Sequence, residues 1–172
     1  MIFIGDAGTT EAGRPSRRRG VEFANYYHPA PWLTLDADLA WSRARFTDAS
    51  AAGINIPGSV RTVASGGATV ETARGLVGAL RLRYFGARPL VEDGSTQSTP
   101  TTLFNAELGY RWSRRHRLSV DVLNLLDAKN SDIDYFYASR LQGEPAGGVD
   151  DIHFHPVLPR TLRVNLTLGL GR

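Results

Sequence analysis

The stretch RTLRVNLTLGL, from Arg160 to Leu170, decides the fold class of this chain. In an extended conformation, alternate side chains point to opposite faces of a strand. One face then carries only apolar residues: Leu162, Val164, Leu166, Leu168 and Leu170. The positions between them carry Thr, Arg, Asn and Gly. The pattern predicts a strand with one apolar and one polar face, which suits either a soluble sandwich core or a lipid-facing barrel wall.

The same alternation recurs along the rest of the chain. RLSVDVLNLLDA, residues 117–128, begins with it, and LTLDADLAW, residues 33–41, shows it most clearly. Segments rich in Gly, Pro, Ser and Asn separate these runs, and HPAP at 28–31 predicts a turn because two prolines cannot sustain a ladder. We expect a strand remnant in MIFIG, a strand that begins at 118, and strands at 21–27, 32–46, 60–71, 76–85, 102–112 and 160–170.

Three features of this strand list favour a membrane barrel over a soluble sandwich. Several expected strands exceed the usual length of about 5 to 6 residues and match the roughly 9 to 11 that cross a bilayer at a tilt. Long and short connections alternate, as they do in outer-membrane barrels. Aromatic residues gather near strand ends, where the two water interfaces would lie. The fold class we predict is all-β, with antiparallel transmembrane β-barrel strands in a meander.

Composition limits the remaining classes. The chain has 172 residues, of which 42% are hydrophobic and 22% charged, and this balance argues against disorder. A mean hydropathy of -0.22, without an apolar run near 18 residues, excludes a transmembrane helix. The absence of cysteine removes disulfides and thiolate metal sites. A net charge of +3 without a basic helix or aromatic nucleic-acid motif predicts no nucleic-acid partner.

Five segments resemble the last strands of TonB-dependent receptors of the outer membrane, in the order of that family. They are RPSRRRGVEFANYY, PWLTLDADLAWSRARF, NAELGYRW, LSVDVLNLLDAKNSDIDYFY and HPVLPRTLRVNLTLGL. The most specific pieces are VLNLLDAKNSD and PRTLRVNLTLGL. The resemblance implies a barrel of 22 strands with an N-terminal plug and an energy-coupling box. It also implies localisation to the outer membrane and active uptake of a scarce nutrient such as an iron complex or cobalamin.

Neither the plug nor the coupling box can be located in residues 1–172, and no secretory signal is visible. We therefore expect the C-terminal part of a β-barrel domain, an open fragment of a larger barrel with about seven full strands. Its first and last strands should be unpaired, its convex face apolar and its concave face charged. Outer-membrane lipid and an unknown small-molecule substrate are the expected partners, with the TonB complex engaged only through the missing N-terminal part.

Two other classes of protein remain open, and one family feature is missing. The first alternative is a complete small eight-stranded outer-membrane barrel with a structural or adhesive role. The second is a soluble lipocalin-like binder. Family members usually end on an aromatic residue, whereas this chain ends on Leu170, Gly171 and Arg172.

The charged residues of the strands predict which face lines the lumen. Charge on the lipid face costs about 2 to 4 kcal/mol for Arg near the midplane. The residues expected to face the lumen are Arg81, Arg83, Glu107, Arg111, Asp121, Arg163 and Asn165. If Glu107 and Asp121 share this face, the hairpin at SRRH needs an odd number of loop residues unless a bulge intervenes. We expect three or five, centred near Arg114 or Arg115.

Candidate binding residues lie in the last long connection, about 128–159. SDIDYFY offers Asp132, Asp134, Tyr135 and Tyr137 for substrate contact at the barrel mouth, and loop packing is the ordinary alternative. DDIHFHP places His153 and His155 on one side of an extended segment, where they could also contact substrate. A third ligand folding over them would make a metal site. A polar loop that simply contains histidines is the more ordinary explanation, so we predict no metal and no cofactor.

Basic residues near the N-terminus form another candidate. Arg14, Arg17, Arg18 and Arg19 could bind lipopolysaccharide phosphates or an anionic ligand, and a solvated basic loop is the alternative. Asp36 and Asp38 lie two residues apart on a strand, without any sign of the enclosing pocket that general acid catalysis needs. No nucleophile stands beside a partner base, and no phosphate-cradling loop is present. We therefore expect no enzymatic activity.

Overall fold

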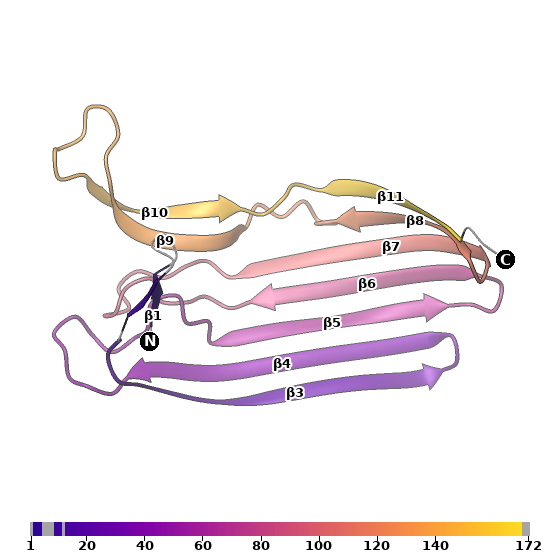
Figure 1. Ribbon diagram of the computed structural model, residues 1–172, viewed down its shortest axis with the longest axis horizontal. Coiled ribbons are helices and arrows are strands. Elements are labelled where there is room, and N and C mark those ends of the chain that lie inside the picture. Colours follow the sequence, from indigo (N-terminus) through magenta and orange to yellow (C-terminus); the bar gives the residue numbers. More distant parts are fainter. Residues whose placement is uncertain (1, 5–8, 12, 170–172) are drawn as a thin grey trace.

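The computed structural model describes residues 2–4, 9–11 and 13–169, and every regular element in this part of the chain is a β-strand. No helix among these residues is long and apolar enough to cross a membrane. Seven strands form one antiparallel sheet (Figure 1). In spatial order they are β11 (Thr161–Leu168), β8 (His116–Leu123), β7 (Thr101–Ser113), β6 (Leu76–Phe85), β5 (Thr62–Glu71), β4 (Leu33–Phe46) and β3 (Ser16–Ala30).

Each of these strands follows its sheet neighbour along the chain, apart from one excursion between β8 and β11. That excursion is a separate hairpin of β9 (Ser131–Ser139) and β10 (Val149–Pro156). Short turns at 31–32, 72–75 and 114–115 lie at one end of the sheet, and the long connections 47–61, 86–100 and 124–160 lie at the other. The predicted antiparallel meander of about seven full strands, with alternating long and short connections, is confirmed.

The register separates two faces of the sheet. One cross-strand row joins Arg163 to Asp121 and Asp121 to Glu107, so these three side chains share a face. Counting in steps of two residues from this row places all seven residues that we expected to face the lumen on that polar face. The opposite face carries Leu162, Val164, Leu166 and Leu168 together with the apolar positions of the other strands.

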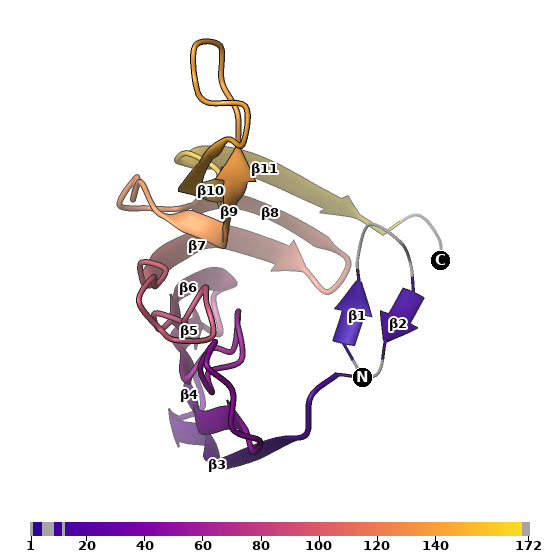
Figure 2. The same ribbon diagram turned by 90° about the vertical axis from the view of Figure 1, so that its left-hand side faces the viewer.

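The sheet curls along its width (Figure 2). Polar-face residues such as Asp36, Asp38 and Arg81 line one of its depressions. The apolar face is open, with Leu162 70% and Leu108 63% exposed. Among residues 13–169 the buried apolar side chains are Phe46, Val77, Leu90 and Leu103. Since exposed apolar area costs about 25 cal/mol per Å² in water, this face needs lipid or another apolar cover.

The two ends of the chain differ in how well they were predicted. β11 and β3 are the sheet edges, and each is paired on one side only within the described residues. A strand does form in MIFIG, but the expectation that it is the unpaired first strand of the sheet is wrong. β1 (Ile2–Ile4) pairs with β2 (Thr9–Glu11) in a hairpin apart from the sheet. Met1, Gly5 and the terminal Leu170, Gly171 and Arg172 lie outside the described residues.

β3 is longer than predicted at both ends. The segment 16–20 was expected to be a loop and HPAP a turn, but residues 16–20 and 28–30 belong to this strand, and of HPAP only Pro31 lies in the turn at 31–32. The ladder with β4 is irregular between Tyr27 and Ala30, where Pro29 stands. A proline is tolerated there because an edge strand leaves one row of backbone groups unpaired and a bulge absorbs the missing donor.

The SRRH turn has two residues, Arg114 and Arg115, so the predicted length of three or five is wrong. The ladder shifts between Arg111 and Ser113, and a bulge supplies the odd residue that parity requires. Glu107 therefore still stands opposite Asp121, as the facing prediction demands.

Candidate ligand site at the long-loop end of the sheet

The sequence NLLDA at the end of β8 anchors the excursion that carries the predicted site residues. Asn124 is 4% exposed, and its amide nitrogen donates to the carbonyl oxygens of Ala128 and Leu158, each at 3.0 Å. Its amide oxygen accepts from the Ala128 N–H at 2.9 Å. One side chain thus ties the outgoing chain to the returning chain, 30 residues later. Asn124 has a φ of 49°, a left-handed conformation that asparagine tolerates better than most residues.

Asp127 closes the same stem from the other side. Its carboxylate accepts hydrogen bonds from the Lys129 ammonium at 2.8 Å and from the Arg160 backbone N–H at 3.0 Å. These two donors, Lys129 first, lower the pKa of Asp127 below its ordinary value. The motif that carried the strongest resemblance therefore holds the foot of the β9–β10 hairpin at the rim of the sheet.

The hairpin itself was not predicted, since the region 128–159 was expected to be loop. Its strands pair in register from Val149 opposite Ser139 to His155 opposite Ile133. Burial along SDIDYFYAS does not follow the polarity of the residues. Asp134 is buried, whereas Tyr135 and Tyr137 are about half exposed. That mixture is typical of a hairpin with no core of its own, which is why periodicity missed it.

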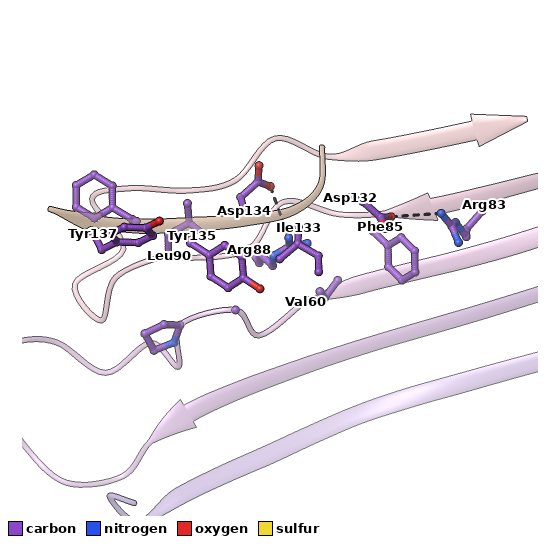
Figure 3. A pocket seen from close by; sticks show the side chains of 13 residues that line it. Val60, Arg83, Phe85, Arg88, Leu90, Asp132, Ile133, Asp134, Tyr135 and Tyr137 are labelled. Carbon is purple, nitrogen blue, oxygen red and sulfur yellow. Dashed lines mark hydrogen bonds and ion pairs between the residues drawn. The ribbon is translucent and has the colours of Figure 1, made fainter. Parts of the chain in front are cut away.

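A cavity of about 600 Å³ lies between β9 and the long connections of the sheet (Figure 3). β9 contributes one wall, including the predicted Asp132, Asp134, Tyr135 and Tyr137. β6 contributes Arg83 and Phe85, and the connections contribute Arg88, Leu90 and Val60. Apolar and aromatic surface with a few charged groups is the usual composition of a small-molecule site. The structure thus brings four of the six predicted residues into one cavity.

Arg88 and Asp134 form the most enclosed charged pair of the cavity. Arg88 Nη2 lies 3.5 Å from Asp134 Oδ2, and their side chains are 10% and 4% exposed. Oδ2 of Asp134 has no hydrogen-bond partner despite this pairing. The pair is therefore an ion pair without a hydrogen bond, and Oδ2 retains the capacity to accept one. In Figure 3, Asp134 points to the opposite side of β9 from Tyr135.

Arg83 and Asp132 form a second, more exposed pair at 3.4 Å, with side chains 49% and 53% exposed. The Arg83 guanidinium also lies 5.5 Å from the centre of the Phe85 ring. Because Arg83 belongs to β6 and Asp132 to the hairpin, this contact joins the sheet wall to the excursion. Sequence reasoning placed Arg83 on the lumen face but gave no signal for Arg88, which lies in a connection.

His153 and His155 lie on the same face of the hairpin as the tyrosines, beside them, and do not line the cavity. The His153 ring stacks on Tyr137 with centroids 3.9 Å apart, and His155 meets Tyr135 edge-on at 6.3 Å. Nε2 of His153 is buried without a hydrogen-bond partner. No group of three or more His, Cys, Asp or Glu side chains among the described residues is placed to hold a metal ion. Direct substrate contact by the six residues stays a prediction.

Arg14 joins the start of β3 to two long connections. Its Nε donates to Asp48 Oδ2 at 2.9 Å, its Nη1 pairs with Glu92, and its Nη2 donates to the Gly53 carbonyl at 3.2 Å. The Arg14 hydrogen bond lowers the pKa of Asp48, and the pKa of Arg14 is raised in return. Arg14 is therefore engaged within the protein, and the arginines at 17–19 lie on β3, so the four do not form one basic loop. Binding of an anion by these arginines stays a prediction.

The family of the chain follows from its sequence pattern and its fold. The family described as TonB dependent receptor-like, beta-barrel matches residues 4–125, from the N-terminal hairpin to the end of β8. The chain belongs to this family. Its open antiparallel sheet is accordingly a portion of a TonB-dependent receptor barrel. No curated protein matches the sequence.

Solved TonB-dependent receptors have the same fold. The chain is similar to the ferric yersiniabactin uptake receptor FyuA from Yersinia pestis, with 22% identity and a TM-score of 0.68 over 89% of this chain and 23% of that one. It is similar to the ferric-catecholate import receptor Fiu from E. coli K12 in its closed form, with 17% identity and a TM-score of 0.71 over 95% and 22%. It is also similar to the siderophore receptor PiuA from Acinetobacter baumannii, with 11% identity and a TM-score of 0.68 over 89% and 22%.

The chain spans less than a quarter of the length of these TonB-dependent receptors. At identities below 25% the likeness concerns the fold, so the substrates named for these proteins say nothing direct about the cavity described above.

Proposed function

We propose that this chain forms part of the wall and mouth of an outer-membrane transporter that takes up a small, scarce nutrient, with an iron complex as the leading class. The supporting observation is the cavity of about 600 Å³ that β9 forms at the long-loop rim of a TonB-dependent receptor sheet. Its position at the end of the polar face suits a site that a solute meets on the way into the lumen. The iron-complex receptors among the similar structures support the substrate class.

The wall has the surfaces that such a transporter needs. Its apolar face suits contact with lipid, and its polar face suits a hydrated interior. Movement of the solute would depend on a plug and on the TonB complex, which belong to regions beyond this segment. The segment itself would select and hold the solute, and it would catalyse no reaction.

The chemistry of the cavity supports a polar solute with aromatic character. Arg83 and Arg88 supply positive charge, while Tyr135 and Tyr137 supply exposed rings with hydroxyl donors. Asp134 pairs with Arg88 and Asp132 with Arg83, so these four groups carry no net charge and the tyrosine rings would supply the main attraction.

Binding and uptake by the full-length receptor that contains this chain would test the proposal. A panel of ferric complexes would be titrated against the detergent-purified receptor, and uptake of labelled iron would be followed in cells. We expect Tyr137→Ala to weaken binding of the cognate complex by about tenfold, since truncation of an aromatic anchor costs roughly 1 to 2 kcal/mol. The matched control is Tyr110→Ala, whose ring is 51% exposed on the apolar face, against 53% for Tyr137.

Equal affinities of the two variants and the wild type for the cognate complex would show that the cavity does not bind the transported solute. Absence of any uptake by the intact receptor, with every complex tested, would overturn the transporter proposal itself.

A further inference from the structure

Four arginines form two consecutive cross-strand pairs on the apolar face of the sheet. Arg17 on β3 stands opposite Arg45 on β4, and Arg19 stands opposite Arg43. The next pairs along the same face are Val21 with Trp41 and Phe23 with Leu39. We call Arg17, Arg19, Arg43 and Arg45 the arginine quartet. Its side chains therefore project from the face that carries the leucines, away from the polar face.

This placement is unusual within the molecule. The other arginines of the seven sheet strands all lie on the polar face: Arg18, Arg81, Arg83, Arg111, Arg117 and Arg163. The quartet therefore holds every arginine on the apolar face of the sheet. A random scatter of basic residues along the strands would not gather them at one corner.

No described residue neutralises the quartet. Arg17, Arg19 and Arg43 are exposed and Arg45 is half-buried, and none of them has an ion pair or side-chain hydrogen bond within the described chain. By contrast, Arg81, Arg83, Arg111 and Arg117 on the polar face each have a carboxylate partner. Like charges directly opposed on neighbouring strands are destabilising, so two such pairs in succession need an external anion.

Position along the strand identifies where that anion would come from. The apolar band on β4 runs from Leu33 to Trp41, which is about 27 Å along a strand at roughly 3.4 Å per residue. A tilt of about 40° reduces this to a height of about 21 Å, close to the roughly 25 Å band of outer-membrane barrels. Arg43 and Arg45 follow directly after Trp41, at the end of the sheet that carries the long connections. The quartet thus begins where the hydrocarbon ends and the headgroups lie.

We propose that the arginine quartet binds the phosphate groups of an anionic lipid headgroup in the adjoining leaflet. Guanidinium groups form bidentate, charge-assisted hydrogen bonds with phosphate, and four of them on two rungs can hold two phosphates about one rung apart. The Trp41 ring and the neighbouring Val21 and Phe23 side chains would pack against the acyl chains beneath. The lipid is thus held at both its headgroup and its tails, which free phosphate could not match.

The proposal goes beyond the transport function and rests only on the contact of the apolar face with lipid. It does not depend on the identity of the transported solute or on the cavity at β9. Failure of nutrient uptake would therefore leave it intact.

Lipid retention by the full-length receptor provides the test. The receptor would be purified in detergent, mixed with lipopolysaccharide or with phosphatase-treated lipopolysaccharide, and bound lipid would be counted by native mass spectrometry. We expect at least tenfold tighter retention of the phosphorylated lipid, and we expect millimolar inorganic phosphate not to compete. Equal retention of both lipids, or full competition by inorganic phosphate, would overturn the proposal.

Variants assign the effect to the quartet. Replacement of Arg17, Arg19, Arg43 and Arg45 by Gln should abolish the preference for phosphorylated lipid. The control replaces four exposed arginines elsewhere, Arg18, Arg74, Arg114 and Arg140, and removes the same net charge. Heat-modifiable migration would verify that each variant has folded. If the quartet variant does not fold, Arg19→Gln and Arg43→Gln singly should each weaken retention, and an unchanged preference in both would contradict the assignment.

Discussion

Arg81 on β6 and Asp36 on β4 form an ion pair across the strand that separates them. Arg81 Nη1 lies 2.5 Å from Asp36 Oδ1, and the intervening residue of the same cross-strand row is Gly67 on β5. A Cβ at position 67 would stand 2.7 Å from the Arg81 side chain, so the guanidinium passes through space that only glycine leaves open. The polar face is therefore organised by rows of residues over three strands.

This relationship predicts that a side chain at position 67 uncouples residues 36 and 81. A double-mutant cycle with Asp36→Asn and Arg81→Gln should give a coupling free energy of about 0.5 to 1 kcal/mol in the native background, because Arg81 is half exposed. In a Gly67→Val background the coupling should fall to nearly zero. Gly66→Ala, on the opposite face of the same strand, serves as control and should preserve it. Urea unfolding of the refolded receptor supplies the free energies, and an undiminished coupling with Val at 67 would contradict the geometry.

Successive side chains of β11 point to opposite faces of the sheet, which predicts different environments for neighbouring positions. Arg163 shares a row with Asp121 on the polar face, and Val164 is 68% exposed on the apolar face. Cysteines introduced singly at 163 and 164 should therefore react differently with a lipid-phase maleimide, with position 164 labelled at least several-fold faster. A water-soluble reagent should reverse the order. Equal labelling by both reagents would indicate a slipped register.

The stem of the β9–β10 hairpin predicts a large effect of Asn124. Asn124→Ala leaves the Ala128 N–H and the Ala128 and Leu158 carbonyls without their partner and forces a left-handed conformation on alanine. We expect the hairpin to become destabilised by about 2 to 4 kcal/mol. Limited proteolysis within 128–160 should accelerate accordingly. Asn124→Gly relieves the backbone strain only, so it should lie between the wild type and Asn124→Ala, and identical cleavage of all three would refute the anchoring role.

The Arg14–Asp48 contact predicts an acid-sensitive loop. Its hydrogen bond lowers the pKa of Asp48 in the folded state, so the stabilisation is complete above the ordinary value near 3.9 and is lost as the pH falls through the lower folded value. Pepsin cleavage within 47–58, relative to Asp48→Asn at each pH, should be slower for the wild type at pH 5. The difference should vanish toward pH 2. Asp93→Asn, in the other connection, should leave this difference in place.

The alternation of apolar and polar residues was sufficient to predict the sheet and the facing of its strands, but not the length of one turn or the presence of the β9–β10 hairpin. Arg163, Asp121 and Glu107 could be placed on one face from parity alone, because side-chain direction in a strand is a local property. The two-residue turn at Arg114 and Arg115 could not be predicted, because a bulge at Trp112 changes the count without leaving a mark in the pattern. The β9–β10 hairpin was missed for a related reason, since it has no core whose periodicity would be visible.

The candidate site shows the same division. SDIDYFY stood out by its residue types, and its tyrosines and aspartates do line a cavity. Arg88, which pairs with Asp134, comes from a connection 46 residues earlier, and only folding brings the two together. His153 and His155 suggested a ligand site by their spacing, and the structure gives them Tyr137 and Tyr135 as neighbours.

By itself, the sequence determined the all-β class, the antiparallel order of the strands and the polarity of their two faces, since each follows from interactions between residues close in the chain. Only the tertiary structure decided which arginines are neutralised. Arg14 meets Asp48 and Glu92 through long-range contacts, whereas Arg17 and Arg19, a few residues on, meet Arg45 and Arg43. The sequence alone does not distinguish Arg14 from Arg17 and Arg19, because the partner of each arginine depends on the segment that folding places beside it.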